Sequence, residues 1–341
     1  RHMGAMKNLR FGLAVLLFVV VIASTGVMGQ AARVYEIAIF EDPTTLNIWA
    51  SLGPDATVWN AYVGDRQSYV TLYDNAEPDF VLCPSAALGM PTPIKEEKID
   101  GKTFYTSNVR MRRDLKWSDG KPLTADDVVF SYMAPLALDP NKLGGNWPGL
   151  IDPNILARVE KIDDYSVKFL LTEPPGLAQW QYGMLQAYIL PKAYWSPIVD
   201  KALKAADPVK ELLAHDPVGQ PAAGAWVIER WEKGAFVTHT PNKYYGLKGD
   251  TNTFYANGAF VLENKKTGVK WSTGDAKGDI KLQVVEGPYV DQLRFRILQN
   301  QNAAVLSLMK GEVDFILNSL GLQRGFQEQL KKAPNIATIE N

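Results

Sequence analysis

Strand-like and helix-like segments alternate along most of this 341-residue chain. Residues 34–40 form an apolar run typical of a buried strand, and residues 293–297 alternate apolar with charged side chains, as a strand does. Between them, Thr124 precedes apolar positions that recur at helical spacing, and Asp127 stands where a capping-box carboxylate would. Elements of both kinds interleaved in this way predict a mixed α/β fold.

The composition supports large apolar cores. Hydrophobic residues make up 46% of the chain and charged residues 21%, which excludes a disordered, collagen-like or low-complexity protein. Cys83 is the only cysteine, so no internal disulfide can form and the cores must hold the fold. The net charge is −1 with no long run of one sign, so no nucleic-acid partner is expected. A chain of this length predicts two lobes, or one large one.

The N-terminal segment is predicted to direct export. Residues 1–5 look like a cloning remnant, and Lys7 and Arg10 then precede an apolar run at residues 11–22, the pattern of a secretory signal peptide. This run spans only about 18 Å, against roughly 30 Å for the hydrocarbon core of a membrane. A retained anchor is the alternative, because the stretch lengthens if the small residues after it are counted. We expect residues 1–32 to be remnant and signal peptide.

Later segments predict further elements. Residues 158–171 and 225–240 each have the alternation and central turn of a β-hairpin, and residues 176–187 are expected to be helical. Residues 246–287 differ from the rest, because glycine, lysine, aspartate and asparagine dominate there and apolar stretches are short. We interpret them as a solvent-exposed insertion that forms a β-ribbon.

The sequence carries no recognisable motif for catalysis or metal binding. No G-x-S-x-G, H-E-x-x-H or C-x-x-C pattern occurs, and only His215 and His239 lie outside the N-terminal remnant, too few for a zinc site or a serine triad. Asp126 and Asp127 could suggest paired catalytic carboxylates, but side chains at consecutive helical positions diverge, and helix capping explains both. Cys83 lies among apolar residues and is expected to be a small buried side chain. We therefore expect no metal, no cofactor and no enzymatic activity.

Tryptophan is unusually frequent, with nine in the chain. Trp49, Trp147 and Trp180 fall in sequence expected to form loops or helix ends. Such rings can fill a core or pack between lobes, or they can offer a stacking surface to peptide side chains or sugar rings. Both interpretations stay open for each ring. The candidate ligand-binding residues are Trp147, Trp49, Asn47, Trp180 and Tyr182.

A longer motif carries a resemblance to a known family. Residues 110–133 read RMRRDLKWSDGKPLTADDVVFSYM, which resembles the signature of the family 5 extracellular solute-binding proteins of bacterial ABC importers. The resemblance runs from about residue 34 to residue 341, with residues 247–287 as an insertion. Further segments similar to the family follow in its order: ILPK at 189–192, DPVG at 216–219, NKYYG at 242–246, YVDQLRFRI at 289–297 and GEVD at 311–314. Residues 220–223, QPAA, depart from the family's pattern after DPVG.

The resemblance implies a two-lobed α/β fold of the periplasmic-binding-protein kind that closes on its ligand. Residues 33–298 would form the first lobe, with the exposed insertion 246–287 within it. Residues 299–341 would begin a second lobe, the rest of which would lie beyond this sequence, so that the chain is expected to be a piece of a longer protein.

The resemblance also implies a function without catalysis. The protein would be the substrate-binding component of an ABC importer, capturing an oligopeptide or similar small solute outside the membrane and delivering it to a permease. It would be exported to the periplasm or the cell exterior, associate with the membrane through the permease, and act as a monomer. A ligand-sensing surface module and a secreted hydrolase are the alternatives. The sequence leaves open whether the ligand is a peptide, an oligosaccharide or a nickel chelate.

Overall fold

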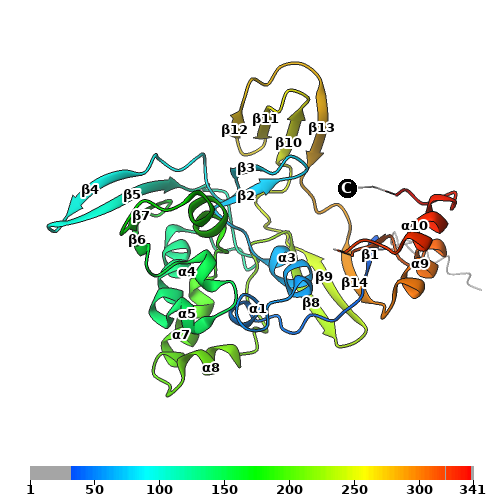
Figure 1. Ribbon diagram of the computed structural model, residues 1–341, viewed down its shortest axis with the longest axis horizontal. Helices are drawn as coiled ribbons and strands as arrows, with labels where there is room; N and C mark the ends of the chain where they lie inside the picture. The colour runs from blue at the N-terminus through cyan, green and yellow to red at the C-terminus, as the bar shows by residue number, and fades with distance from the viewer. Residues whose placement is uncertain (1–31, 319, 339–341) are drawn as a thin grey trace, which may run out of the picture. The chain divides into compact units, whose positions relative to one another are not determined.

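The structure is a computed structural model that describes residues 32–318 and 320–338 (Figure 1). The predicted signal peptide therefore lies almost wholly outside the described residues. Within the described chain, no helix is long and apolar enough to cross a membrane. Helices are interleaved with strands that form four sheets, which confirms the mixed α/β prediction.

A five-stranded sheet combines strands from the beginning and the end of the described chain, in the order β15-β1-β14-β9-β8. Strand β1 runs parallel to both β14 and β15, with Val34 opposite Gln292. Strand β9 is antiparallel to β14 and to β8, which confirms the hairpin predicted at residues 225–240. The bounds are Val34–Ile39 for β1, Trp226–Glu232 for β8, Phe236–Pro241 for β9, Gln292–Ile297 for β14 and Phe315–Ile316 for β15, with helix α9 at Gln301–Met309 between the last two.

The core of this sheet also holds a histidine. Ile39, Val237 and Phe295 pack with Trp59 in one buried cluster. The His239 ring is fully buried beside Phe295, and its Nε2 lies 2.8 Å from the carbonyl oxygen of Val63. Burial lowers the pKa of His239 to about 4. His239 is therefore a structural residue, as its place in a hairpin strand indicates.

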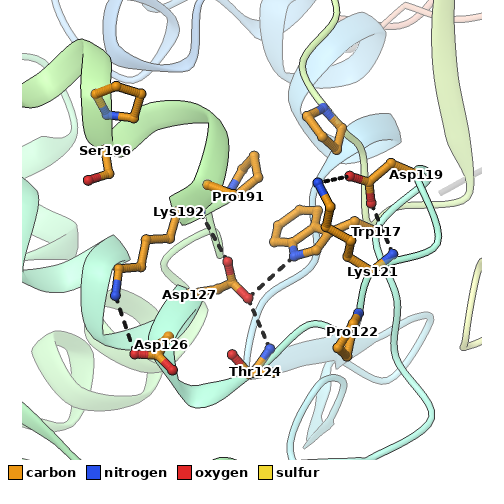
Figure 2. A pocket seen from close by; sticks show the side chains of 13 residues that line it. Trp117, Asp119, Lys121, Pro122, Thr124, Asp126, Asp127, Pro191, Lys192 and Ser196 are labelled. Atoms are coloured by element: carbon orange, nitrogen blue, oxygen red, sulfur yellow. Dashed lines mark hydrogen bonds and ion pairs between the residues drawn. The ribbon is translucent and has the colours of Figure 1, made fainter.

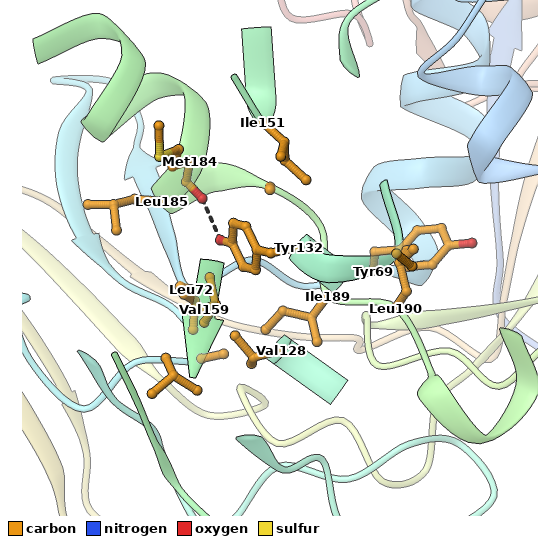
Figure 3. Packing of buried hydrophobic residues seen from close by; sticks show 14 of the residues in the cluster. Tyr69, Leu72, Val128, Tyr132, Ile151, Val159, Met184, Leu185, Ile189 and Leu190 are labelled. Carbon is orange, nitrogen blue, oxygen red and sulfur yellow. Dashed lines mark hydrogen bonds between the residues drawn. The ribbon is translucent and has the colours of Figure 1, made fainter. Parts of the chain in front are cut away.

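A second, antiparallel sheet has the order β4-β5-β7-β6 and is packed against helix α4, which in turn contacts helix α7. Figure 3 shows its core, in which the Tyr132 ring lies among Val128, Val159 and Leu72 and its hydroxyl donates to the Met184 carbonyl oxygen at 2.5 Å. The predicted hairpin at residues 158–171 is confirmed. The bounds are Lys95–Ile99 for β4, Lys102–Arg110 for β5, Leu156–Asp163 for β6, Ser166–Leu171 for β7, Ala125–Leu138 for α4, Lys192–Ala202 for α7 and Pro208–Leu213 for α8.

Short helical turns connect these sheets. Residues 58–68 are helical, and Tyr69 after them adopts an extended conformation. The helix expected at residues 176–187 is confirmed as a π-helical and a 3-10 segment. The bounds are Ile48–Ser51 for α1, Val58–Asn60 for α2, Ala61–Asp65 for η1, Arg66–Ser68 for α3, Pro140–Leu143 for α5, Trp147–Leu150 for α6, Ala178–Gly183 for η2, Met184–Gln186 for η3 and Arg324–Lys331 for α10.

Residues 246–287 form more than the expected ribbon. They fold into a four-stranded antiparallel sheet, and Phe254, Phe260 and Leu262 pack with Cys83 in a small core of their own. Successive side chains of a strand point to opposite faces of the sheet, so alternate apolar residues are enough to form a core. This segment therefore has a core although its sequence has no long apolar stretch. Cys83 is buried, as expected. The bounds are Thr251–Tyr255 for β10, Phe260–Asn264 for β11, Val269–Thr273 for β12 and Ile280–Val285 for β13, against the hairpin of β2 at Tyr73–Ala76 and β3 at Val81–Pro84.

A buried ion pair fastens this sheet to the rest of the fold. The Arg112 side chain is 1% exposed, and its guanidinium donates to Asp250 at 2.5 Å and to Asp114 at 2.7 Å. The Asp250 carboxylate, itself 3% exposed, also accepts from the Asn264 side chain at 2.7 Å. Residue 112 belongs to the signature motif, so the motif is bonded directly to the insertion.

Candidate functional site

Two of the predicted ligand-binding residues pack on each other. Trp49 is fully buried and Trp147 is 2% exposed, and their rings stack with centroids 5.0 Å apart. The Trp147 indole nitrogen donates to the Trp49 carbonyl oxygen at 3.0 Å. The Trp195 ring lies edge-on to Trp49, with ring centroids 6.0 Å apart. In this structure the rings fill the core, which is the packing alternative that the sequence leaves open.

The other three predicted residues differ from one another in burial and in contacts. Asn47 is 1% exposed, caps helix α1 and donates to the carbonyl oxygens of Leu212 and His215, both at 2.9 Å. Trp180 is buried edge-on against the Phe169 ring, whereas Tyr182 is 53% exposed. Tyr182 is thus the member of the predicted set with accessible surface. Contact of these five residues with a ligand stays a prediction.

The signature motif lines a surface hollow of about 530 Å³, shown in Figure 2. The Asp127 carboxylate lies at its centre and accepts hydrogen bonds from the Thr124 and Lys192 backbone N–H groups, both at 3.0 Å, and from the Trp117 indole at 3.3 Å. Thr124 and Asp127 form the capping box that the sequence predicts. Burial raises the pKa of Asp127, and these hydrogen bonds oppose the rise.

Apart from Asp127, the charged side chains that line this hollow form ion pairs. Asp126 pairs with Lys161 at 2.7 Å and with Lys192 at 3.3 Å. The hydrogen bond from Lys161 is the main cause of the lowered pKa of Asp126. Asp119 and Lys121 form a second pair at 3.0 Å. These charges hold α4, α7 and the turn before α4 together. Asp126 is thus bound by lysine side chains, and Asp127 by backbone and indole N–H groups.

A second cavity, of about 220 Å³, has a different chemistry. Its lining includes the oppositely charged residues Arg66 and Asp74, both exposed. Within the described residues neither forms an ion pair within 4.0 Å, although the Arg66 guanidinium lies over the Tyr62 ring at 5.2 Å. The remaining lining is Tyr69, Val70, Thr71, Ser85, Gln186, Tyr188, Gly224, Ala225, Tyr245 and Leu247. We call this the polar cavity.

Carboxyl groups with a raised pKa lie in the lining of the polar cavity, at Asp74, and elsewhere in the fold, at Glu286 and Asp65. Protein packing raises the pKa of Asp74, although its side chain meets solvent, while the Asn75 N–H and Arg66 oppose the rise. Burial, together with Asp250 and Asp74, raises the pKa of Glu286. Nearby, buried Asp65 accepts from the Ser51 hydroxyl at 2.6 Å, and burial raises the pKa of Asp65 to about 7. For all three carboxyl groups burial is the main cause of the raised pKa, and it favours the neutral, protonated form.

Two side-chain amides, of Asn75 and Gln186, each have one atom without a hydrogen-bond partner in the described chain. The Asn75 amide donates to the Gln186 side-chain oxygen at 3.3 Å. This single bond leaves Asn75 Oδ1 and Gln186 Nε2 buried with no hydrogen-bond partner in the described chain. Such atoms are rare in folded proteins and costly to leave unpaired. Sequence reasoning missed the polar cavity, because its lining comes from segments far apart in the chain and none of them carries a motif.

No metal centre accompanies these features. Within residues 32–318 and 320–338, no group of three or more histidine, cysteine, aspartate or glutamate side chains could hold a metal ion. His215 instead packs against the Tyr194 and Trp195 rings, with its Nε2 3.0 Å from the Tyr194 hydroxyl.

Two curated proteins are similar in sequence to this chain. The oligopeptide-binding protein AppA of Bacillus subtilis is 26% identical over 229 residues, which are 67% of this chain and 32% of that protein. The dipeptide-binding protein of Escherichia coli is 31% identical over 167 residues, 45% of this chain and 29% of that protein. The chain thus matches about a third of the length of these curated relatives.

Solved structures share the fold. The structure of AppA in complex with a nonapeptide matches 89% of this chain and 46% of its own, with a TM-score of 0.59 and 21% identity. A periplasmic oligopeptide-binding protein of Thermotoga maritima matches 92% of this chain and 46% of its own, with a TM-score of 0.60 and 20% identity. These neighbours are periplasmic binding proteins with a two-lobed fold, of which the present chain covers a part.

The family model of bacterial extracellular solute-binding proteins, family 5 (middle region), matches residues 92–340. This match includes the signature motif, the capped helix α4 and the hollow around them. Since it covers well over half of the chain, the protein belongs to family 5 of the bacterial extracellular solute-binding proteins.

Proposed function

We propose that this protein is the substrate-binding component of an ABC importer, which captures an oligopeptide or similar small solute outside the membrane and delivers it to a permease. The observation that carries the proposal is the family match over residues 92–340, on a fold shared with periplasmic oligopeptide-binding proteins. The relatives named for oligopeptide and dipeptide binding make peptides the first solutes to test.

The absence of catalysis is part of the proposal. In the signature hollow, the carboxylates of Asp126 and Asp127 are engaged by lysines and by backbone N–H groups, and no general acid faces a general base there. This arrangement supports binding over hydrolysis. Export to the periplasm or the cell exterior, and action as a single chain, complete the proposal.

Calorimetry combined with product analysis tests the proposal. The chain is titrated with trialanine, and with mannotriose as an oligosaccharide probe, and the mixture is then analysed by chromatography. We expect binding heat with trialanine and intact peptide after prolonged incubation. Cleavage of trialanine would favour the secreted hydrolase, and a chain that binds neither probe would contradict the proposed solute class.

Delivery is tested separately from binding. An importer reconstituted in liposomes with its permease and ATPase should hydrolyse ATP faster when the solute-loaded protein is added. A protein that binds solute with no effect on ATP hydrolysis would support the ligand-sensing alternative, because sensing and uptake begin with the same binding event.

A further inference from the structure

We propose that the outer edge of strand β13 is a self-association surface, through which two copies of this chain pair edge to edge and join their β10–β13 sheets into one. The inference does not depend on the proposed function, because it concerns the insertion at residues 246–287 and leaves each copy to bind solute by itself.

Strand β13 presents an unpaired edge (Figure 1). It is the last strand in the order β12-β11-β10-β13, and among the described residues it pairs with β10 alone. The backbone N–H and C=O groups on its other side are open to a further strand, an arrangement against which natural sheets usually protect their edges. The two edges of the second sheet are protected by charge, because β4 has four charged side chains in five residues and β6 has four in eight. Strand β13 has one, Lys281.

The side chains along this edge are largely apolar. Four of the six residues of β13 are apolar and 38–55% exposed: Ile280, Leu282, Val284 and Val285. Leu282 lies opposite Phe254 on β10, so Leu282 and Val284 share the face on which Phe254 packs with Cys83. The small core of the insertion therefore continues past its own cover at this edge, and a further strand would extend it.

A strained turn holds an aromatic ring beside the same strand. Phe80, in the turn between β2 and β3, is 65% exposed and has a φ of +52°, which a bulky side chain rarely adopts. Its neighbour Asp79 pairs with Lys281 at 2.5 Å, so this turn lies next to the edge. An aromatic side chain held in solvent at a cost in backbone strain is typical of a contact residue rather than of a packing residue.

The chemistry of this edge favours a second copy as its partner. Because Asp79 neutralises Lys281 within each chain, two such edges meet without unpaired like charges. In an antiparallel pairing about a two-fold axis at Gln283, Leu282 of each copy lies opposite Val284 of the other, so apolar side chains meet on the shared face. This pairing satisfies the open backbone groups of both edges at once, and it is closed, because no third strand can add there.

The size of the edge sets the strength of the pairing. A standard stable interface uses about 20–30 residues a side, whereas β13 has six. The dimer should therefore be weak, with a dissociation constant on the order of 100 µM, and the protein should be a monomer when it is dilute.

Sedimentation equilibrium at concentrations from well below to well above that constant tests the proposal. We expect a reversible monomer–dimer equilibrium for the parent chain. Val284→Lys adds a charge to each copy where apolar side chains meet, and it should weaken association at least tenfold. Ser272→Lys adds the same charge to β12, the opposite edge strand of the same sheet, and should leave association unchanged. Circular dichroism and a thermal scan establish that each variant is folded.

Two further variants test the geometry. Gln283→Cys should form a disulfide-linked dimer when treated with oxidised glutathione, because the axis brings the two cysteines opposite each other. Ser272→Cys is the matched control and should stay monomeric under the same treatment, since Cys83 is buried in both variants. Phe80→Asn removes the ring but tolerates the positive φ, so it should weaken association at least threefold without lowering the melting temperature.

Three results would overturn the assignment: a parent chain that stays monomeric at the highest concentration, a dimer that Val284→Lys leaves intact, or a dimer that Gln283→Cys does not cross-link. Titration of Val284→Lys with trialanine separates this inference from the proposed function. We expect the variant to bind trialanine as the parent does. A chain that dimerises through β13 but binds no solute would contradict the proposed function alone.

Discussion

Asp65 offers the sharpest test of the energetics of this fold. Its side chain is 3% exposed at the end of η1, and its carboxylate accepts one hydrogen bond, from Ser51, within the described chain. Burial raises the pKa of Asp65 from its ordinary value of 3.8 to about 7. The native state therefore holds this proton more tightly than the unfolded state does. The protonated Asp65 therefore contributes its full share to the free energy of unfolding below pH 3.8. This contribution is lost as the pH rises through 7 and changes no further above that.

The magnitude follows from the difference in pKa. A shift of about three units corresponds to about 4 kcal/mol between acidic and neutral pH, an upper value for a group with one hydrogen bond. The substitution Asp65→Asn keeps the size and the acceptor for Ser51 but removes the titration. The difference in unfolding free energy between this variant and the parent should be near zero at pH 4. It should rise with pH in favour of the variant and level off at several kcal/mol above pH 7.

Urea unfolding followed by tryptophan fluorescence, at intervals from pH 4 to pH 8.5, measures this difference. Ser51→Ala is the matched variant: it withdraws the hydrogen bond that stabilises the charged carboxylate, so its pH dependence should be steeper than that of the parent. A constant difference between Asp65→Asn and the parent across this range would refute the reasoning, because it would mean that the buried carboxyl titrates equally in both states.

Two further predictions concern buried contacts. Asp250→Ala leaves Arg112 and Asn264 without their shared acceptor in the interior. It should lower the free energy of unfolding by about 3–5 kcal/mol and so lower the melting temperature. An unchanged melting temperature would contradict the buried ion pair. Trp147→Ala removes the ring stacked on Trp49 and should cost about 3–5 kcal/mol while sparing solute affinity, whereas lost affinity at constant melting temperature would restore the ligand-facing interpretation.

Local patterns in the sequence were good predictors of local structure. The capping box at Thr124 and Asp127 depends on a spacing of three residues, and the hairpins at residues 158–171 and 225–240 depend on alternation around a turn. Each of these signals lies within the element that it predicts. The motif at residues 110–133 likewise identified the family, because it is a contiguous run.

Local sequence patterns could not predict the contacts and cavities that form between segments far apart in the chain. Arg112 and Asp250 are 138 residues apart, and nothing in either neighbourhood specifies the other. The polar cavity combines Arg66 and Asp74 with residues near 186 and 245, so its charges meet only after folding. For Trp147, in a glycine-rich stretch, the sequence left open whether the ring meets a ligand or the core, and tertiary packing buries it. The side chain's surroundings, which decide between core and ligand contact, are a property of the whole fold.

The parallel pairing of β1 has a consequence for biosynthesis. Strand β1 contacts no sheet partner near it in sequence: its neighbours are β14 and β15, and the Arg33–Asp291 hydrogen bond at the edge of this pairing spans 258 residues. At roughly 5–20 residues per second, a ribosome needs about 13–50 s to make that intervening stretch. Throughout this interval an apolar strand waits without its hydrogen-bonding partners. The five-stranded sheet can close only after nearly all of the described chain has been synthesised, which makes this half of the fold a late event on the ribosome or after release.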